Sequence, residues 1–160
     1  MQIPISLVVN GEPGSATVEA RTSLADMLRD ELLLTGTHVG CEHGVCGSCT
    51  VLLDGEPVRA CLMLAVQADG REVTTIEGLA DDRVGRAVQE AMRSTHAFQC
   101  GFCTPGILTT VTALLRESDG QLTRAEIREH LAGNLCRCSG YEPIVDAVEA
   151  AAAELSTGAA

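Results

Sequence analysis

The eight cysteines are the residues of this chain best able to do chemistry, and they fall into two sets of four. The first set lies in "GCEHGVCGSC" and "RAC", where four, two and eleven residues separate Cys41, Cys46, Cys49 and Cys61. In the second set, two, thirty-two and one residues separate Cys100, Cys103, Cys136 and Cys138. Four thiolates are the ligand number of a tetrahedral zinc site and of an iron–sulfur cluster.

The spacing of the first set favours a [2Fe–2S] cluster over zinc. C-x4-C-x2-C is the plant-type ferredoxin spacing, whereas zinc ribbons have two short CxxC pairs of similar form. Gly40, Gly44 and Gly47 would allow the loop to turn its backbone N–H groups toward cluster sulfurs. The spacing of the second set alone does not distinguish a zinc site from a cluster. Helices predicted to begin near Thr104-Pro105 and Glu142-Pro143 would favour a negatively charged group there.

Three other uses of the cysteines are disfavoured. Cys41-x-His43 resembles half of a Rieske site, but no cysteine is followed by histidine three residues later. A catalytic thiol would need a cysteine outside the two sets, and there is none. Four disulfides would need an oxidising compartment, and the N-terminus "MQIPISLVVNGE" lacks the basic region of an export signal. We therefore expect a cytoplasmic protein with reduced or metal-bound thiols.

Composition excludes some classes of function. The 160 residues are enough for one ordinary domain or two small ones, and 46% of them are apolar. Aromatic residues make up only 2%, so a metal site would help to stabilise such small domains. A net charge of −11 argues against nucleic-acid binding, which needs clustered basic residues. No segment is long and apolar enough to span a membrane.

The first half of the sequence predicts a small mixed α/β unit around the first cysteine set. Residues 3–9 and 16–20 read as strands joined at Asn10-Gly11, and residues 50–61 form a second hairpin across Asp54-Gly55. Ser23 is the expected N-cap of a helix that Gly36 closes. Residues 71–79 read as another strand. We expect this domain to cover residues 1–78.

The second half predicts four short helices, which suggests a small bundle over residues 79–160. They cover residues 83–95, 105–118, 123–133 and 143–155. Pro105 and Pro143 are expected at the first helical position, and Thr123 with Glu126 makes a capping box. The fold class expected for the whole chain is α+β.

The cysteine motifs resemble those of one family. "GCEHGVCGSC", "RAC", "FQCGFCTPG" and "GNLCRCSGY" occur in the order and at the separations found in the small iron–sulfur subunit of molybdenum hydroxylases, the xanthine oxidase and aerobic carbon monoxide dehydrogenase family. The resemblance covers about residues 3 to 152. It implies an N-terminal β-grasp ferredoxin-like domain and a C-terminal four-helix bundle, each ligating one [2Fe–2S] cluster through its four cysteines.

The resemblance also implies partners and a function. The chain would relay single electrons from a molybdopterin cofactor in a large subunit to FAD in a medium subunit, or to another acceptor, within a dimer of heterotrimers. Gln99 and the Cys138 region would approach the pterin. A free-standing ferredoxin-like carrier and a structural metal-binding module are the alternatives. The substrate, whether carbon monoxide, an aldehyde, a purine or an N-heterocyclic aromatic, is not readable from this chain.

Overall fold

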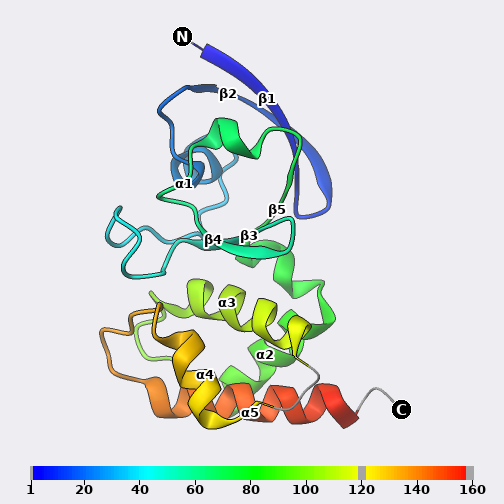
Figure 1. Cartoon of the computed structure of the whole chain (residues 1–160), viewed down its shortest axis with the longest axis vertical. Coiled ribbons are helices and arrows are strands. Elements are labelled where there is room, and N and C mark those ends of the chain that lie inside the picture. The colour runs from blue at the N-terminus through cyan, green and yellow to red at the C-terminus, as the bar shows by residue number, and fades with distance from the viewer. Residues whose placement is uncertain (1, 119–121, 158–160) are drawn as a thin grey trace.

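Five strands of the first half form one mixed sheet in the order β2-β1-β5-β3-β4. The computed structural model describes residues 2–118 and 122–157. Its strands are β1 (Gln2–Val9), β2 (Glu12–Glu19), β3 (Thr50–Leu53), β4 (Glu56–Arg59) and β5 (Glu72–Thr74). β1 pairs antiparallel with β2 and parallel with β5, which itself pairs antiparallel with β3. Figure 1 shows the sheet in the upper half of the molecule and the helices of the second half of the chain below it.

Both predicted hairpins are confirmed, and their turns have the same geometry. Asn10 and Gly11 have φ angles of 52° and 83°, and Asp54 and Gly55 have 50° and 90°. Two successive positive φ angles are the signature of the type I′ turn, which matches the twist of the strands on either side. The local sequence therefore determines the register of both strand pairs.

The helix after Ser23 is shorter than predicted. Ser23 does cap it, because its Oγ accepts the N–H of Asp26 at 3.0 Å. The helix runs through α1 (Leu24–Asp26) into a π-helical turn, η1 (Met27–Glu31), and the chain leaves it at Leu33, whose φ is 57°. Gly36 therefore does not close the helix, and the expectation that it would was wrong. A Cβ at Gly36 would lie 2.5 Å from Ile76 Cγ2, so glycine is needed there for close packing.

The strand expected over residues 71–79 is also shorter than predicted. Only β5 is extended, and residues Ile76–Ala80 form the 3-10 helix η3. The side chain of Asn10 accepts the backbone N–H of Thr75 at 2.8 Å, where the strand ends. Leu79 is then fully buried between the sheet and the helices, with Leu52 and Ala113. The apolar residues of this segment thus bury themselves as a helical turn rather than as a strand.

The four helices of the second half are α2 (Arg83–Ser94), α3 (Thr104–Glu117), α4 (Arg124–Leu131) and α5 (Tyr141–Thr157). Thr123 and Glu126 form the predicted capping box before α4. The helices begin earlier than the prolines suggested: Pro105 is the second residue of α3 and Pro143 the third of α5. The prediction of a proline at the first helical position was therefore wrong at both sites.

The buried apolar residues form two main clusters. One is made by the sheet, by α1 and η1, and by the 3-10 helix η2 (Ala65–Ala68). The other joins α2, α3, α4 and α5. Helix α3 contacts β3 and β4, so it lies directly against the sheet, as Figure 1 shows. The two halves of the chain are therefore packed together, and α3 lies between the sheet and the other helices.

Candidate metal centres

The first cysteine set lies on one side of the sheet. Cys41, Cys46 and Cys49 belong to the loop between η1 and β3, and Cys61 follows β4. The backbone N–H of Cys46 points at the sulfur of Cys41 at 3.4 Å, and that of Cys61 points at the sulfur of Cys49 at 3.5 Å. The fold thus brings together all four cysteines that the sequence assigned to this set.

Glycines allow this loop to fold tightly. Gly44 and Gly47 have φ angles of 83° and 72°, in the left-handed region that glycine adopts without strain. A Cβ at Gly44 would lie 2.4 Å from Leu62 Cδ1. At Gly40 a Cβ would lie 3.3 Å from the sulfur of Cys46 and 3.1 Å from the ring of Phe102. The loop therefore has little room for side chains beside its thiols.

The second cysteine set lies at the starts of two helices. Cys100 and Cys103 precede α3, with Cys103 at its N-cap, and Cys136 and Cys138 lie between α4 and α5. The N–H of Gly140 points at the sulfur of Cys136 at 3.4 Å. Tyr141 Oη accepts the N–H of Cys136 at 2.7 Å and donates to the carbonyl of Asn134 at 3.3 Å. Cys103 thus lies at a helix start, and the sulfur of Cys136 receives a backbone N–H.

All eight cysteines are free thiols, and within each set they approach one another in pairs. In the first set the thiol of Cys41 interacts with that of Cys46, and the thiol of Cys61 with that of Cys49. In the second set Cys100 interacts with Cys138, and Cys103 with Cys136. Each set therefore presents two pairs of sulfur atoms.

The environment gives the thiols of the first set different acidities. Hydrogen bonding by the backbone N–H of Cys46, followed by that of His43, lowers the pKa of Cys41 to about 6. Burial raises the pKa of Cys61 to about 11, and the neighbouring Cys49 thiol adds to this effect. Metal ligation needs the thiolate, and Cys41 therefore supplies that form more readily than Cys61.

The second set likewise has one thiol with a lowered pKa and one with a raised pKa. The backbone N–H of Phe102, followed by the Cys138 thiol, lowers the pKa of Cys100, which is exposed. Burial, followed by the neighbouring Cys136 thiol, raises the pKa of Cys103 to about 12. A positively charged metal would be needed to hold Cys103 as a thiolate at neutral pH.

The two thiol sets fit binuclear clusters. A [2Fe–2S] cluster has two irons, each held by two thiolates, which matches two sulfur pairs. Among the described residues, no three His, Cys, Asp or Glu side chains converge as on a single metal ion. Thr104, next to Cys103, has a buried hydroxyl with no partner among the described residues.

Gln99 and Cys138, which were expected near a pterin, lie together. Gln99 is exposed, and its Nε2 donates to the carbonyl of Cys138 at 3.4 Å. Phe98 and Phe102 are 49% and 46% exposed, and Leu135 is also exposed. The two phenylalanines therefore do not fill the core. An open apolar surface accompanies the second cysteine set, which is where a partner was expected.

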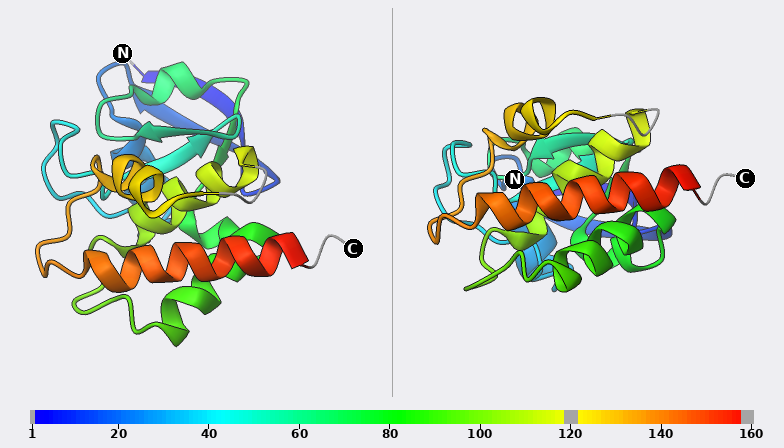
Figure 2. Two further views of the ribbon diagram at one scale, coloured as in Figure 1. Left: turned by 60° about the horizontal axis from the view of Figure 1, so that its bottom comes forward. Right: turned by 90° about the horizontal axis from the view of Figure 1, so that it is seen from below.

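Contacts between the two cysteine loops were not predicted from the sequence. His38, near the first set, stacks on Phe102 with ring centroids 4.9 Å apart, and its Nδ1 donates to the carbonyl of Phe102 at 2.8 Å. The N–H of Leu135 donates to the carbonyl of Cys46 at 2.9 Å. Figures 1 and 2 show the loops of both sets at the same side of the molecule. The only sequence signal was that both loops are rich in glycine and cysteine.

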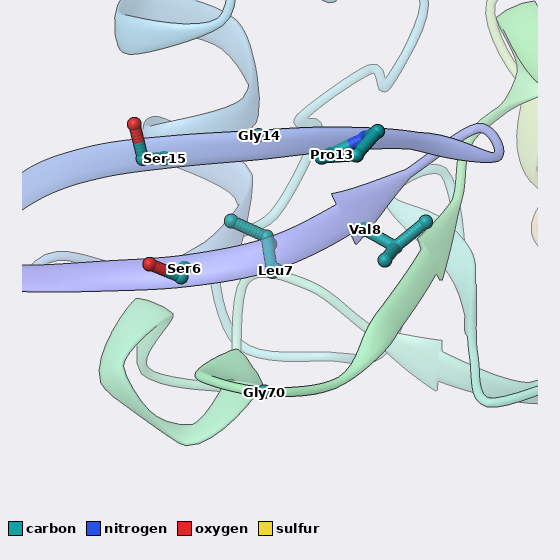
Figure 3. Close-up of a pocket in the computed structure, with 7 residues that line it drawn as sticks. All are labelled: Ser6, Leu7, Val8, Pro13, Gly14, Ser15 and Gly70. Carbon is teal, nitrogen blue, oxygen red and sulfur yellow. The ribbon is translucent and has the colours of Figure 1, made fainter.

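A groove elsewhere on the surface carries no comparable chemistry. It lies along the β1–β2 hairpin, as Figure 3 shows, and is lined by Ser6, Leu7, Val8, Pro13, Gly14, Ser15 and Gly70. None of these side chains is charged at neutral pH. This groove therefore offers no charged group to a ligand. Within the described ranges, no helix is both long and apolar enough to cross a membrane.

Comparison with known families finds a 2Fe-2S binding domain in each half of the chain. Residues 7–75 match the model of a 2Fe-2S iron-sulfur cluster binding domain, and residues 75–149 match that of a [2Fe-2S] binding domain. Caffeine dehydrogenase subunit gamma of Pseudomonas sp. (strain CBB1) is 55% identical over 148 residues, which cover 91% of this chain and 88% of that protein. The chain belongs to the family of small iron–sulfur subunits of molybdenum hydroxylases.

Two further comparisons agree with this molybdenum hydroxylase family. The nicotine 6-hydroxylase small subunit of Paenarthrobacter nicotinovorans is 51% identical, over 92% of this chain and 88% of that protein. A chain in the crystal structure of quinoline 2-oxidoreductase from Pseudomonas putida 86 has a TM-score of 0.91 and 50% identity. That alignment covers 99% of this chain and 98% of the other. The chain is thus an electron-transfer subunit of a multi-subunit oxidoreductase, with the molybdenum site in another subunit.

Proposed function

We propose that each cysteine set ligates one [2Fe–2S] cluster. Cys41, Cys46, Cys49 and Cys61 would hold the first, and Cys100, Cys103, Cys136 and Cys138 the second. The observation that carries this proposal is the arrangement of each set as two thiol pairs with backbone N–H groups directed at sulfur. Bound clusters would supply two one-electron centres, and the protein would ligate them, donate hydrogen bonds and limit access of water.

The surroundings of the two sites support one route for the electrons. We propose that the second site faces the molybdopterin of the large subunit, with Gln99 and Cys138 at the contact. The first site would then deliver electrons to FAD in a medium subunit or to another acceptor. The exposed aromatic residues beside Gln99 support the first assignment, because large exposed apolar groups mark interaction surfaces.

The architecture expected from the family is part of this proposal. Residues 1–78 would form the β-grasp ferredoxin-like domain and residues 79–160 the four-helix bundle. Two main core clusters, and family models that meet at residue 75, support that division. We also propose a dimer of heterotrimers and a cytoplasmic location. A reducing compartment suits eight free cysteines.

The names of the relatives favour one substrate class for the complex. Caffeine dehydrogenase, nicotine 6-hydroxylase and quinoline 2-oxidoreductase are named for N-heterocyclic compounds, and their chains are 50% to 55% identical to this one. Aldehyde oxidoreductase PaoA of Escherichia coli (strain K12) is 43% identical. We propose an N-heterocyclic aromatic substrate, oxidised at the molybdenum of the large subunit.

Electron paramagnetic resonance of the purified complex tests the proposal. Reduction by dithionite should give two distinct [2Fe–2S] signals, and a redox titration should assign a separate midpoint potential to each. Reduction by the substrate should give the same two signals through the molybdenum centre. A complex that turns over its substrate and shows only one such signal would contradict the assignment of two clusters to this chain.

A further inference from the structure

The side chain of Asn134 connects the two cysteine loops. Asn134 is 2% exposed and lies two residues before Cys136. Its Nδ2 donates to the carbonyl of Gly47, in the first loop, at 3.2 Å. Its Oδ1 accepts from Thr110 Oγ1, on α3, at 3.2 Å. A buried polar side chain with both ends bonded fixes the position of its neighbours, because breaking either contact leaves a buried group unpaired.

The carbonyl oxygen of Gly47 accepts several hydrogen bonds. Besides Asn134 Nδ2, it accepts from the N–H of Thr50 at 3.2 Å and from Thr50 Oγ1 at 2.6 Å. Thr50 Oγ1 in turn accepts from Arg59 Nη1 at 2.5 Å. Gly47 lies between Cys46 and Cys49, so this carbonyl sits inside the first thiol set.

Arg59 makes a reciprocal contact from the first half to the second. Its Nη2 donates to the carbonyl of Gly133 at 2.8 Å, next in the chain to Asn134. The next residue after Asn134, Leu135, donates its backbone N–H to the carbonyl of Cys46. Three consecutive residues, Gly133 to Leu135, therefore bond to the first half of the chain.

The two loops also lie too close for side chains. A Cβ at Gly47 would lie 2.4 Å from the carbonyl oxygen of Gly133 and 2.7 Å from Asn134 Nδ2. A Cβ at Gly106, in the first turn of α3, would lie 2.2 Å from the carbonyl oxygen of Gly47. Such contacts leave little freedom for one loop to shift against the other.

We infer that Asn134 is a positioning residue that fixes the two cysteine sites relative to each other. It does so by holding Gly47 against residues 133–135, with Arg59 as its counterpart, so that the bond between Leu135 and Cys46 stays formed. The inference rests on the proposed function for the presence of two clusters. It adds that their mutual placement depends on contacts between the two loops, among them the buried amide of Asn134, rather than on the cysteines alone.

Matched Asn→Asp substitutions test this inference in the full chain within its complex. Asn134→Asp keeps an acceptor for Thr110 but removes the donor to Gly47. Asn10→Asp removes an amide donor that lies outside the two cysteine loops, the bond from Nδ2 to Thr75 Oγ1. Arg59→Met is a second test, because it removes the bond to Gly133 from a side chain that is only half-buried, and so it should fold readily.

Two measurements separate positioning from plain stability. In the reduced complex, the magnetic interaction between the two clusters should change in Asn134→Asp and Arg59→Met, while iron content and the g-values of each signal stay as in the wild type. Hydrogen exchange of the peptide containing Leu135 should become roughly ten-fold faster. Asn10→Asp should change neither. The core amides of both halves should keep their rates.

Two outcomes would overturn the inference. One is an unchanged magnetic interaction and unchanged Leu135 exchange in both variants. The other is faster exchange spread evenly over both cores, which would make Asn134 an ordinary stabilising residue. If the wild-type chain bound no clusters, the proposed function would fail, and the Leu135 exchange rates would still decide the role of Asn134.

Discussion

The carbonyl of Cys46 accepts a hydrogen bond from the N–H of Leu135 at 2.9 Å, and Leu135 is bonded directly to Cys136. Two cysteines of different sets are therefore joined by one hydrogen bond and a few covalent bonds. They are 90 positions apart in the sequence (136 − 46). This hydrogen bond therefore brings the loop of the first cysteine set next to the loop of the second.

Cys46→Ser should remove the first cluster and leave the second in place. All four thiols of the second set belong to the second half, and the contacts between the loops use the carbonyl of residue 46 rather than its sulfur. Iron should fall to about half of the wild-type content, since one of two [2Fe–2S] sites is lost. One of the two paramagnetic signals should disappear.

The reciprocal variant Cys138→Ser is the control, and it should remove the other signal. Loss of both signals from a folded Cys46→Ser protein would contradict the assignment of one cluster to each set.

Gly47→Ala should be far more damaging than Gly55→Ala. Both glycines have positive φ angles, 72° and 90°, so both substitutions carry a backbone cost of roughly 1–2 kcal/mol. Only Gly47 meets other atoms, because its Cβ would lie 2.4 Å from the carbonyl of Gly133, whereas nothing lies within 4 Å of a Cβ at Gly55. Denaturant unfolding and iron content measure the difference. Equal losses of stability and of iron in the two variants would mean that the loops are not in close contact.

Tyr141→Phe should disturb the second site alone. The substitution removes the oxygen that accepts the N–H of Cys136 at 2.7 Å and leaves that partly buried donor unpaired. The expected cost is roughly 1–3 kcal/mol of stability. The midpoint potential of the second cluster should shift, because the backbone of Cys136 loses this anchor beside the N–H that Gly140 directs at the Cys136 sulfur, and hydrogen bonds to sulfur are among the features that set the potential. A redox titration followed by paramagnetic resonance gives both potentials, and a shift in the first cluster alone would contradict the expectation.

Gln99→Ala should weaken docking to the molybdenum subunit without loss of either cluster. Gln99 is exposed in this chain and bonds to the carbonyl of Cys138, so it is placed to contact a partner at the second site. The loss should be roughly 1–3 kcal/mol if one buried partner group is left unpaired in the complex. The molybdenum-to-iron ratio of the co-purified complex measures it. Gln89→Ala on α2 is the control. Full molybdenum in the Gln99 variant would show that this residue does not make the docking contact.

Local signals in the sequence predicted much of this structure. Asn10-Gly11 and Asp54-Gly55 specify hairpin turns through two residues alone, and the spacing of the cysteines is itself a chemical signature. What could not be predicted depends on packing between distant segments. Gly36 reads as a helix terminator, but it is required because Ile76 lies against it. No signal in the sequence indicated the role of Asn134, because its partner Gly47 is distant in the chain and the hydrogen bond between them is visible only in the folded structure.

Iron, zinc and acid-labile sulfide measured together on the as-isolated chain test the central claim most directly. Two [2Fe–2S] clusters require about four iron atoms and about four acid-labile sulfides per chain, with a red-brown colour. Substitution of any cysteine of either set should lower both values. Stoichiometric zinc without labile sulfide would contradict the assignment of two clusters. The cysteines would then hold a structural metal that cannot carry electrons.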